Sequence, residues 1–110
     1  MILEIRTYRL KPGTLDEFVR LMREESLPLL RRHGVDVVDA GASLVAEDGA
    51  EEAYLIRAFS SIAEREQQEA AFYRSDEWRR GPRDAVLSRI ESYHTIVIVA
   101  SADAIRALRC

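Results

Sequence analysis

Hydrophobic and polar residues alternate in four short segments of the chain, and each alternation predicts a β-strand. The first segment covers residues 2–10, ILEIRTYRL, which has a period of two and contains isoleucine, threonine and tyrosine. The second covers 35–48 and is loosened by Gly41; the third and fourth cover 53–59 and 92–100. The sequence therefore predicts a sheet of four strands.

Between the first two strands the apolar residues change to spacings of three, four and seven, which predicts a helix over residues 14–33. Thr14 and Glu17 have the spacing of a capping box at its start. Pro28 should kink or split this helix, because proline lacks a backbone donor and crowds the preceding turn. Gly34 suits the left-handed position that follows a helix.

A second capping box, Ser61 and Glu64, opens a helix over residues 61–75. Shorter helical turns follow it, one of them containing Trp78, and a closing helix is predicted over 101–109. The element order is β-α-β-β-α-β, which predicts an α+β, ferredoxin-like sandwich with a four-stranded antiparallel sheet and both main helices on one face. We expect one domain over residues 1–100, with 101–110 as its C-terminal helical extension.

The period of two divides the strand residues into two faces. We expect the helices to cover the face that contains Leu3, Ile5, Tyr54, Ile56 and Ala58. The opposite, open face would then carry a mixed set of residues: Glu4, Arg6, Tyr8, Leu10, Leu55, Arg57 and Phe59. An exposed apolar patch usually marks an interface, so two open faces are expected to pair. They would enclose the polar residues in a chamber shared by two subunits of a dimeric α/β barrel.

Composition limits the possible partners. The 110 residues are 47% hydrophobic and 32% charged, which is typical of a globular protein. The net charge of −3, with arginines interleaved among acidic residues, argues against a nucleic-acid partner. The chain contains no apolar run long enough to span a bilayer, and its first residues resemble a strand rather than a signal peptide. We expect a cytoplasmic protein without a membrane partner. Cys110, as the single cysteine, cannot form an internal disulfide.

Four stretches of the sequence resemble the NIPSNAP family: EIRTYRLKPGTLDEF at 4–18, LPLLRRHG at 27–34, AFSSIAERE at 58–66 and SDEWR at 75–79. The resemblance covers the chain to about residue 100 and implies a dimeric α/β barrel. That superfamily includes cofactor-free monooxygenases, haem-degrading enzymes, dehydratases and isomerases. NIPSNAP members mostly lack an assigned reaction, and some are discussed as mitochondrial scaffold or signalling proteins. We expect no transit peptide in this short chain, so the mitochondrial context is not carried over.

Three residues are the candidate catalytic groups. Arg6 could hold a carboxylate or an enolate, and the Tyr8 phenol could donate a hydrogen bond or a proton. His94 could act as a general base, because histidine titrates near neutral pH. For each of them a structural role is the alternative, such as an Arg6–Glu4 ion pair that only satisfies buried charge. The expected ligand-binding residues are Glu4, Arg57, Phe59 and Trp78. Trp78 and Tyr73 could line the mouth of the pocket, or they could instead close the core at a helix break.

No metal motif, nucleophile signature, phosphate-binding loop or dinucleotide fold appears in the sequence, so we expect neither a metal nor a cofactor. We interpret the chain as a homodimer that binds a small anionic or aromatic metabolite, in a pocket between each sheet and its helices or its partner. Cofactor-independent catalysis in that pocket is left open. The alternative is a non-catalytic dimeric interaction or scaffold module.

Overall fold

The computed structural model describes residues 1–109, so Cys110 lies outside the described residues. Four antiparallel strands form one sheet in the order β2-β3-β1-β4. Their bounds are β1 Ile2–Leu10, β2 Asp36–Ala42, β3 Glu52–Phe59 and β4 Ile90–Val99. This arrangement confirms the predicted α+β class and ferredoxin-like sheet.

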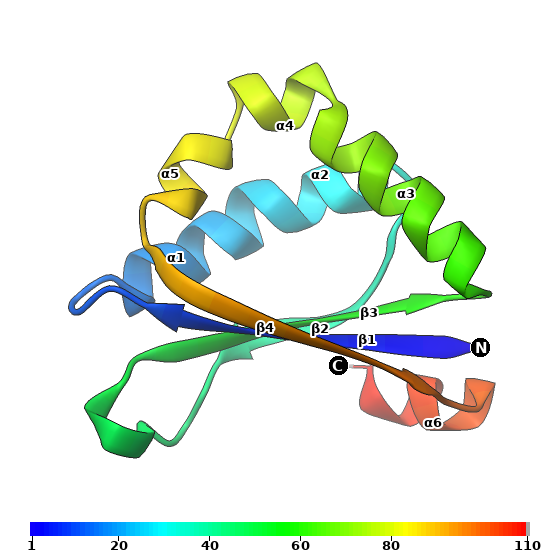
Figure 1. Ribbon diagram of the computed structural model, residues 1–110, viewed down its shortest axis with the longest axis horizontal. Helices are drawn as coiled ribbons and strands as arrows, with labels where there is room; N and C mark the ends of the chain where they lie inside the picture. The colour runs from blue at the N-terminus through cyan, green and yellow to red at the C-terminus, as the bar shows by residue number, and fades with distance from the viewer. Residues whose placement is uncertain (110) are drawn as a thin grey trace.

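Two helical layers lie on opposite faces of this sheet (Figure 1). The larger layer contains α1 Leu15–Leu21, α2 Leu27–Arg32, α3 Ile62–Arg74, α4 Asp76–Arg80 and α5 Arg83–Leu87. In this layer α3, α4 and α5 form an arch over the sheet, with α1 and α2 beside it (Figure 1). Helix α6, Ala102–Leu108, lies on the other face, where Ile105 packs against Leu3, Val38 and Ala58.

The first helical segment is interrupted where Pro28 predicted a kink or a split. A π-helical turn, η1 (Met22–Ser26), separates α1 from α2. Pro28 lies at the start of α2 and has no N–H to donate to the preceding turn. A wider turn in this position accommodates the proline ring and lets the helical path continue. Gly34 ends the segment with a positive φ of 81°, as predicted.

Strand β2 is shorter than the sequence pattern predicted, because it ends at Ala42 rather than near residue 48. The Ser43 hydroxyl donates to the carbonyl of Val45 at 2.7 Å and folds the chain into a turn. Leu44 and Val45 are exposed within this turn. A short 3-10 turn, η2 (Glu47–Gly49), then leads into β3. The apolar residues of 43–46 extended the alternating pattern without forming sheet.

The strand residues divide between the two faces of the sheet as predicted. However, helices α1–α5 cover the face that was expected to be open. Tyr8 packs on Phe18 of α1 with ring centroids 5.1 Å apart, and Arg6 reaches Tyr73 of α3. Leu3 instead belongs to the cluster that contains Ile105 of α6. The expectation that the polar residues line the open face is therefore wrong. They lie between the sheet and α3, where further polar residues satisfy them.

The two predicted capping boxes have different outcomes. Ser61 caps α3, since its hydroxyl accepts a hydrogen bond from the Glu64 amide at 3.1 Å. Thr14 does not cap α1; its hydroxyl donates to the Lys11 carbonyl at 2.6 Å. The carboxylate of Glu51 accepts from the Leu15 amide at 3.2 Å in its place. A residue distant in the sequence thus supplies the acceptor that the local pattern attributed to Thr14.

Replacing Ser61 by alanine should lower the free energy of unfolding by about 1 kcal/mol, because the first turn of α3 loses its acceptor. Thr14→Ala should have the smaller effect, since the acceptor at the start of α1 belongs to Glu51. Urea denaturation of both variants measures the difference. Equal losses of stability would contradict this account of the two helix starts.

Candidate functional site

A buried ion pair links the two central strands beneath α3. Glu4 of β1 faces Arg57 of β3 across the sheet, and both side chains are fully buried. Arg57 Nε donates to Glu4 Oε2 at 2.6 Å, and Arg57 Nη2 also contacts that oxygen. Arg65 of α3 donates from Nε to Glu4 Oε1 at 2.8 Å. Both carboxylate oxygens are therefore paired, as burial of a charge requires.

The hydroxyl of Tyr73, near the end of α3, connects two guanidinium groups. It accepts from Arg57 Nη1 at 3.0 Å and from Arg6 Nη1 at 3.2 Å. Arg6 also donates from Nε to Thr95 Oγ1 at 2.9 Å, and its guanidinium carbon lies 5.0 Å from the centroid of the Tyr93 ring. Arg6 is therefore held in one position by groups from β4 and from α3. A cation fixed in this way requires little reorganisation to meet an anion.

Glu69 brings a second carboxyl group into this cluster. Its Oε1 lies 3.6 Å from Arg6 Nη2 and 3.6 Å from Arg57 Nη2, and its Oε2 lies 3.1 Å from Arg65 Nε. Three guanidinium groups thus surround two carboxyl groups. The cluster has a net positive charge even when both carboxyls are ionised.

The two carboxyl groups have opposite pKa shifts. Burial alone would raise the pKa of Glu4, but contact with Glu69 and the charges of Arg57 and Arg6 lower it to about 2. Burial and contact with Glu4 raise the pKa of Glu69 to about 7, against the lowering effect of Arg57. Near neutral pH, Glu4 is therefore the permanent anion and Glu69 is the group that exchanges a proton. Burial also raises the pKa of the Tyr8 phenol, which stays protonated.

The cluster forms one wall of a cleft of about 440 Å³ between the sheet and the arch of helices. The polar part of the lining contains Arg6, Tyr8, Glu69, Tyr73 and Arg83. The remaining lining is largely apolar: Trp78, Val86, Leu87, Ile90 and Tyr93. A lining that combines a few polar groups with apolar walls is typical of a small-molecule site. We call this space the cleft.

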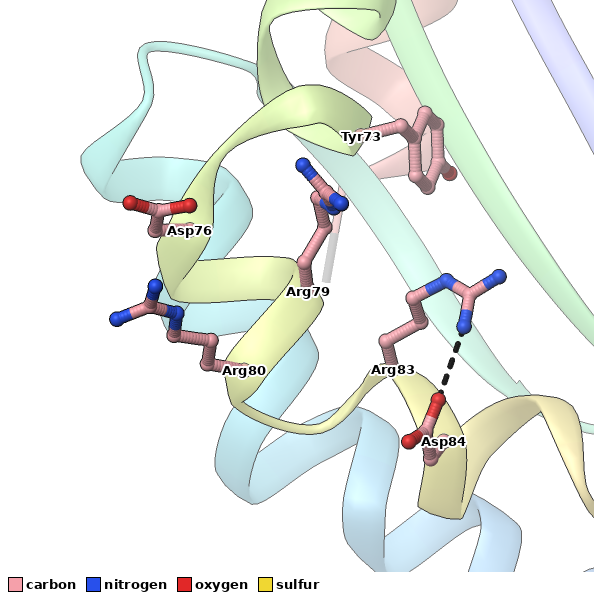
Figure 2. A pocket seen from close by; sticks show the side chains of 6 residues that line it. All are labelled: Tyr73, Asp76, Arg79, Arg80, Arg83 and Asp84. Carbon is pink, nitrogen blue, oxygen red and sulfur yellow. Dashed lines mark hydrogen bonds and ion pairs between the residues drawn. The ribbon is translucent and has the colours of Figure 1, made fainter.

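A second, more polar hollow of about 540 Å³ adjoins the cleft and shares Tyr73 and Arg83 with it. Figure 2 shows that the Arg79 and Arg83 side chains extend toward the side of Tyr73, whereas Arg80 and Asp76 lie on the other side of α4. Arg83 Nη1 donates to Asp84 Oδ1 at 2.9 Å. Three arginines and two aspartates line this hollow, so the side of the cleft that it adjoins carries a small positive excess.

The predicted site residues are divided among four places in the structure, one of which contains His94 alone. Arg6, Tyr8 and Trp78 line the cleft. Glu4 and Arg57 are fully buried in the ion-pair cluster beside it, where they hold Arg65 and Tyr73. Phe59 is buried in the hydrophobic core and is not among the residues that line the cleft.

His94 lies on the opposite side of the sheet from Arg6 and Tyr8. It pairs with Thr7 across β1 and β4, whereas Arg6 pairs with Thr95 and Tyr8 with Tyr93. Its side chain is exposed and lines a separate hollow of about 160 Å³. The expectation that these three residues act in one chamber is therefore wrong, because successive strand residues point to opposite faces.

Sequence reasoning missed two residues of the cluster, Arg65 and Glu69, and treated Tyr73 only as a residue at the pocket mouth. These three residues follow one another at intervals of four along α3, so they form a polar stripe on one face of the helix. The α3 sequence has no continuous apolar stripe to pack on the sheet in their place. The missing apolar stripe was the feature of the sequence that indicated packing of α3 on the sheet through polar groups.

Neither a metal-ligand cluster nor a membrane-spanning helix occurs within residues 1–109. This range contains no group of three or more histidine, cysteine, aspartate or glutamate side chains arranged to hold a metal ion. None of its helices is long and apolar enough to cross a membrane.

Comparison with known proteins agrees with this architecture. A NIPSNAP protein of unknown function from Agrobacterium tumefaciens is 25% identical and has a TM-score of 0.81, with 92% of this chain and 88% of that chain covered. An uncharacterised NIPSNAP domain protein from Burkholderia xenovorans is 18% identical, with a TM-score of 0.80 over 93% of this chain and 96% of its own. An antibiotic biosynthesis monooxygenase shares the fold at 13% identity and a TM-score of 0.62, over 92% of this chain and 99% of that chain.

No curated protein matches the sequence significantly. The family model for NIPSNAP matches residues 3–104, which is nearly the whole chain. This match agrees with the resemblance found in the sequence motifs. The chain belongs to the NIPSNAP family.

Proposed function

We propose that the protein binds a small organic acid with an apolar substituent in the cleft between its sheet and its helices. The observation that carries this proposal is Arg6, a cation held in place by Thr95 and Tyr73 on the wall of a cleft whose lining also contains Trp78, Val86, Leu87 and Ile90. A carboxylate beside Arg6 would offset the positive excess of the cluster. The apolar substituent would lie against residues such as Trp78 and Ile90.

The surroundings of Arg6 favour an anion over a neutral ligand. Glu69 lines the same cleft, and its raised pKa leaves it partly protonated near neutral pH. Protonation of Glu69 increases the net positive charge beside the ligand. Arg83, which pairs with Asp84, adds a further guanidinium group to the lining of the cleft. The Tyr8 phenol stays protonated and supplies a hydrogen-bond donor on the same wall.

We also propose that the protein is a homodimer that pairs through the sheet face opposite α1–α5. Three isoleucines, Ile56, Ile5 and Ile96, are direct neighbours across β3, β1 and β4 on this face. Ile96 and Ile98 are 46% and 43% exposed, and α6 packs toward the β2 side. An apolar sheet face of this kind favours a second sheet as its cover.

Binding of 3-phenylpropionate, compared with its neutral amide, tests the ligand proposal. We expect the wild-type protein to bind the acid at least about 10-fold more tightly than the amide, because a charge-assisted contact with Arg6 contributes about 1.5–3 kcal/mol. The Arg6→Met variant should bind both compounds with similar, weaker affinity. Isothermal titration calorimetry measures all four affinities.

Arg20→Met is the matched control, since Arg20 is an exposed arginine on α1 that pairs with Glu17 and Glu24. It should leave the preference for the acid unchanged. Equal affinity of the wild-type protein for acid and amide, or an Arg6→Met variant that retains the preference, would refute the proposed role of Arg6.

A further inference from the structure

The cleft contains a carboxyl group that a bound ligand can reach. Glu69 lines the cleft with a side chain that is 13% exposed, whereas Glu4 is fully buried and already bound by Arg57 and Arg65. Of the two carboxyls in the cluster, Glu69 is therefore the one that a ligand can reach. The two carboxyl groups occupy different environments. Such a difference separates the pKa values of neighbouring carboxyls, so that one stays ionised while the other exchanges protons.

Tyr73 places a hydrogen-bond donor beside Glu69. The two residues are one helical turn apart on α3, and both line the cleft. Two guanidinium groups donate to the Tyr73 oxygen, which leaves its own hydrogen available for an acceptor in the cleft. Negative charge that develops on such an acceptor would be stabilised by Tyr73 and by the arginines behind it.

We propose that Glu69 is the proton acceptor in a cofactor-independent enolisation of 2-oxo acids that carry an aryl or alkyl substituent. This inference rests on the proposed binding of an organic acid in the cleft. A 2-oxo acid has a carboxylate and a ketone oxygen on adjacent carbons, and Arg6 and Tyr73 are adjacent donors, 3.2 Å apart. Arg6 binds the carboxylate and Tyr73 donates to the ketone oxygen, while the apolar substituent lies along Trp78 and Ile90.

The reaction is a balanced proton transfer. The Glu69 carboxylate takes a proton from the carbon next to the ketone. The C–H electron pair forms the new C=C bond, and the carbonyl π pair moves to the oxygen, which Tyr73 holds. Glu69 then returns the proton to that oxygen, which gives the enol, or to the carbon, which restores the ketone. No electrons are lost or gained, so the step is balanced without an oxidant or a reductant.

The titration of Glu69 suits this role. Its pKa of about 7 gives a substantial fraction of the base form at neutral pH while keeping its proton affinity high. The charged groups beside Glu69 come from β1, β3 and α3: Glu4, Arg6, Arg57 and Arg65. The other titratable groups that line the same cleft are Tyr8, Tyr73, Arg83 and Tyr93. The observed rate should therefore rise with pH to a plateau, with a midpoint near neutral pH.

Phenylpyruvate is the probe for the experiment. Isothermal titration calorimetry measures its binding, and proton NMR in D₂O measures exchange of its C3 hydrogens above the buffer rate. We expect Glu69→Gln to lower the protein-catalysed exchange about 100-fold or more, with affinity changed less than about 3-fold. Tyr73→Phe should also slow exchange. Glu66→Gln, an exposed position on the same helix, should exchange as the wild type does.

The outcomes separate this inference from the binding proposal. Catalysed exchange that depends on Glu69 and loses its pH dependence in Glu69→Gln would support it. Binding of phenylpyruvate without exchange above the buffer rate would overturn the enolisation and leave the binding proposal intact. Exchange by Glu69→Gln at the wild-type rate would overturn the role of Glu69. If phenylpyruvate does not bind, both proposals fail.

Discussion

Replacing Arg57 by methionine should destabilise the protein by about 3–5 kcal/mol at pH 7. The substitution roughly keeps the side-chain volume but leaves the Glu4 carboxylate buried with one of its two oxygens unpaired. Removal of one partner from a buried ion pair has this large effect because the remaining charge keeps its desolvation penalty. The Tyr73 hydroxyl also loses the hydrogen bond that it accepts from Arg57 Nη1 of β3. Urea denaturation measures the loss of stability.

Two variants show whether the loss comes from Glu4. Arg20→Met, which removes two exposed ion pairs, should leave the denaturation midpoint nearly unchanged. The double variant Glu4→Gln/Arg57→Met should be more stable than Arg57→Met alone, because the unpaired charge is absent. If the two substitutions destabilise additively, the charge of Glu4 is not the cause.

The destabilisation by Arg57→Met should also become smaller as the pH falls. In the wild type the folded-state pKa of Glu4 is about 2, below its ordinary value of 4.5, so its contribution to stability is present above pH 4.5 and is lost as the pH falls toward 2. In the variant the pKa of Glu4 rises, because burial remains while the charge of Arg57 is gone and only Arg65 and Arg6 are left beside the carboxyl. Glu4 is then protonated at a higher pH than in the wild type, and the difference between the two proteins narrows as the pH falls.

The alternation within a strand was sufficient to predict which residues share a face of the sheet. It was not sufficient to predict which of the two faces helices α1–α5 cover. A period of two places Glu4, Arg6 and Tyr8 together whichever face is covered. The usual rule assigns the charged face to the outside, and here that rule is wrong. Helix α3 brings Arg65 and Glu69 to the same face, so the charges are paired inside the molecule.

Local signals succeeded where the interaction is local. Ser61 caps the helix that begins beside it, and Gly34 ends the helix that precedes it. Thr14 has an equally good sequence pattern, but Glu51 reaches the start of α1 from the segment before β3. Periodicity within one segment carries no information about such an acceptor.

The same limit explains why only part of the candidate site was predictable. Arg6 and Tyr8 were identified from the first strand and its family motif, and they line the cleft. Glu69 could be recognised only after α3 was placed over β1 and β3, because its environment comes from Glu4, Arg6 and Arg57. A pKa shift is a property of the assembled cluster and of no single segment.

Ile96→Asp should convert the proposed dimer to a monomer. Ile96 lies beside Ile5 in the row of isoleucines on the sheet face opposite α1–α5. An aspartate in this position would be buried unpaired against the second copy. An interface formed by two such faces should exceed about 1,200 Å² in total. Light scattering at micromolar concentration should give about twice the 12.5 kDa chain mass for the wild type and the single mass for the variant.

Ile62→Asp is the matched control for this experiment. Ile62 is 49% exposed, close to the 46% of Ile96, but it lies at the start of α3 on the other side of the sheet. An aspartate in the first turn of a helix is well tolerated, so this variant should remain a dimer. A monomeric wild type would refute the dimer itself. An Ile96→Asp variant that stays dimeric would instead place the interface elsewhere, because a sheet pairing through Ile5 and Ile56 cannot leave their neighbour Ile96 in solvent.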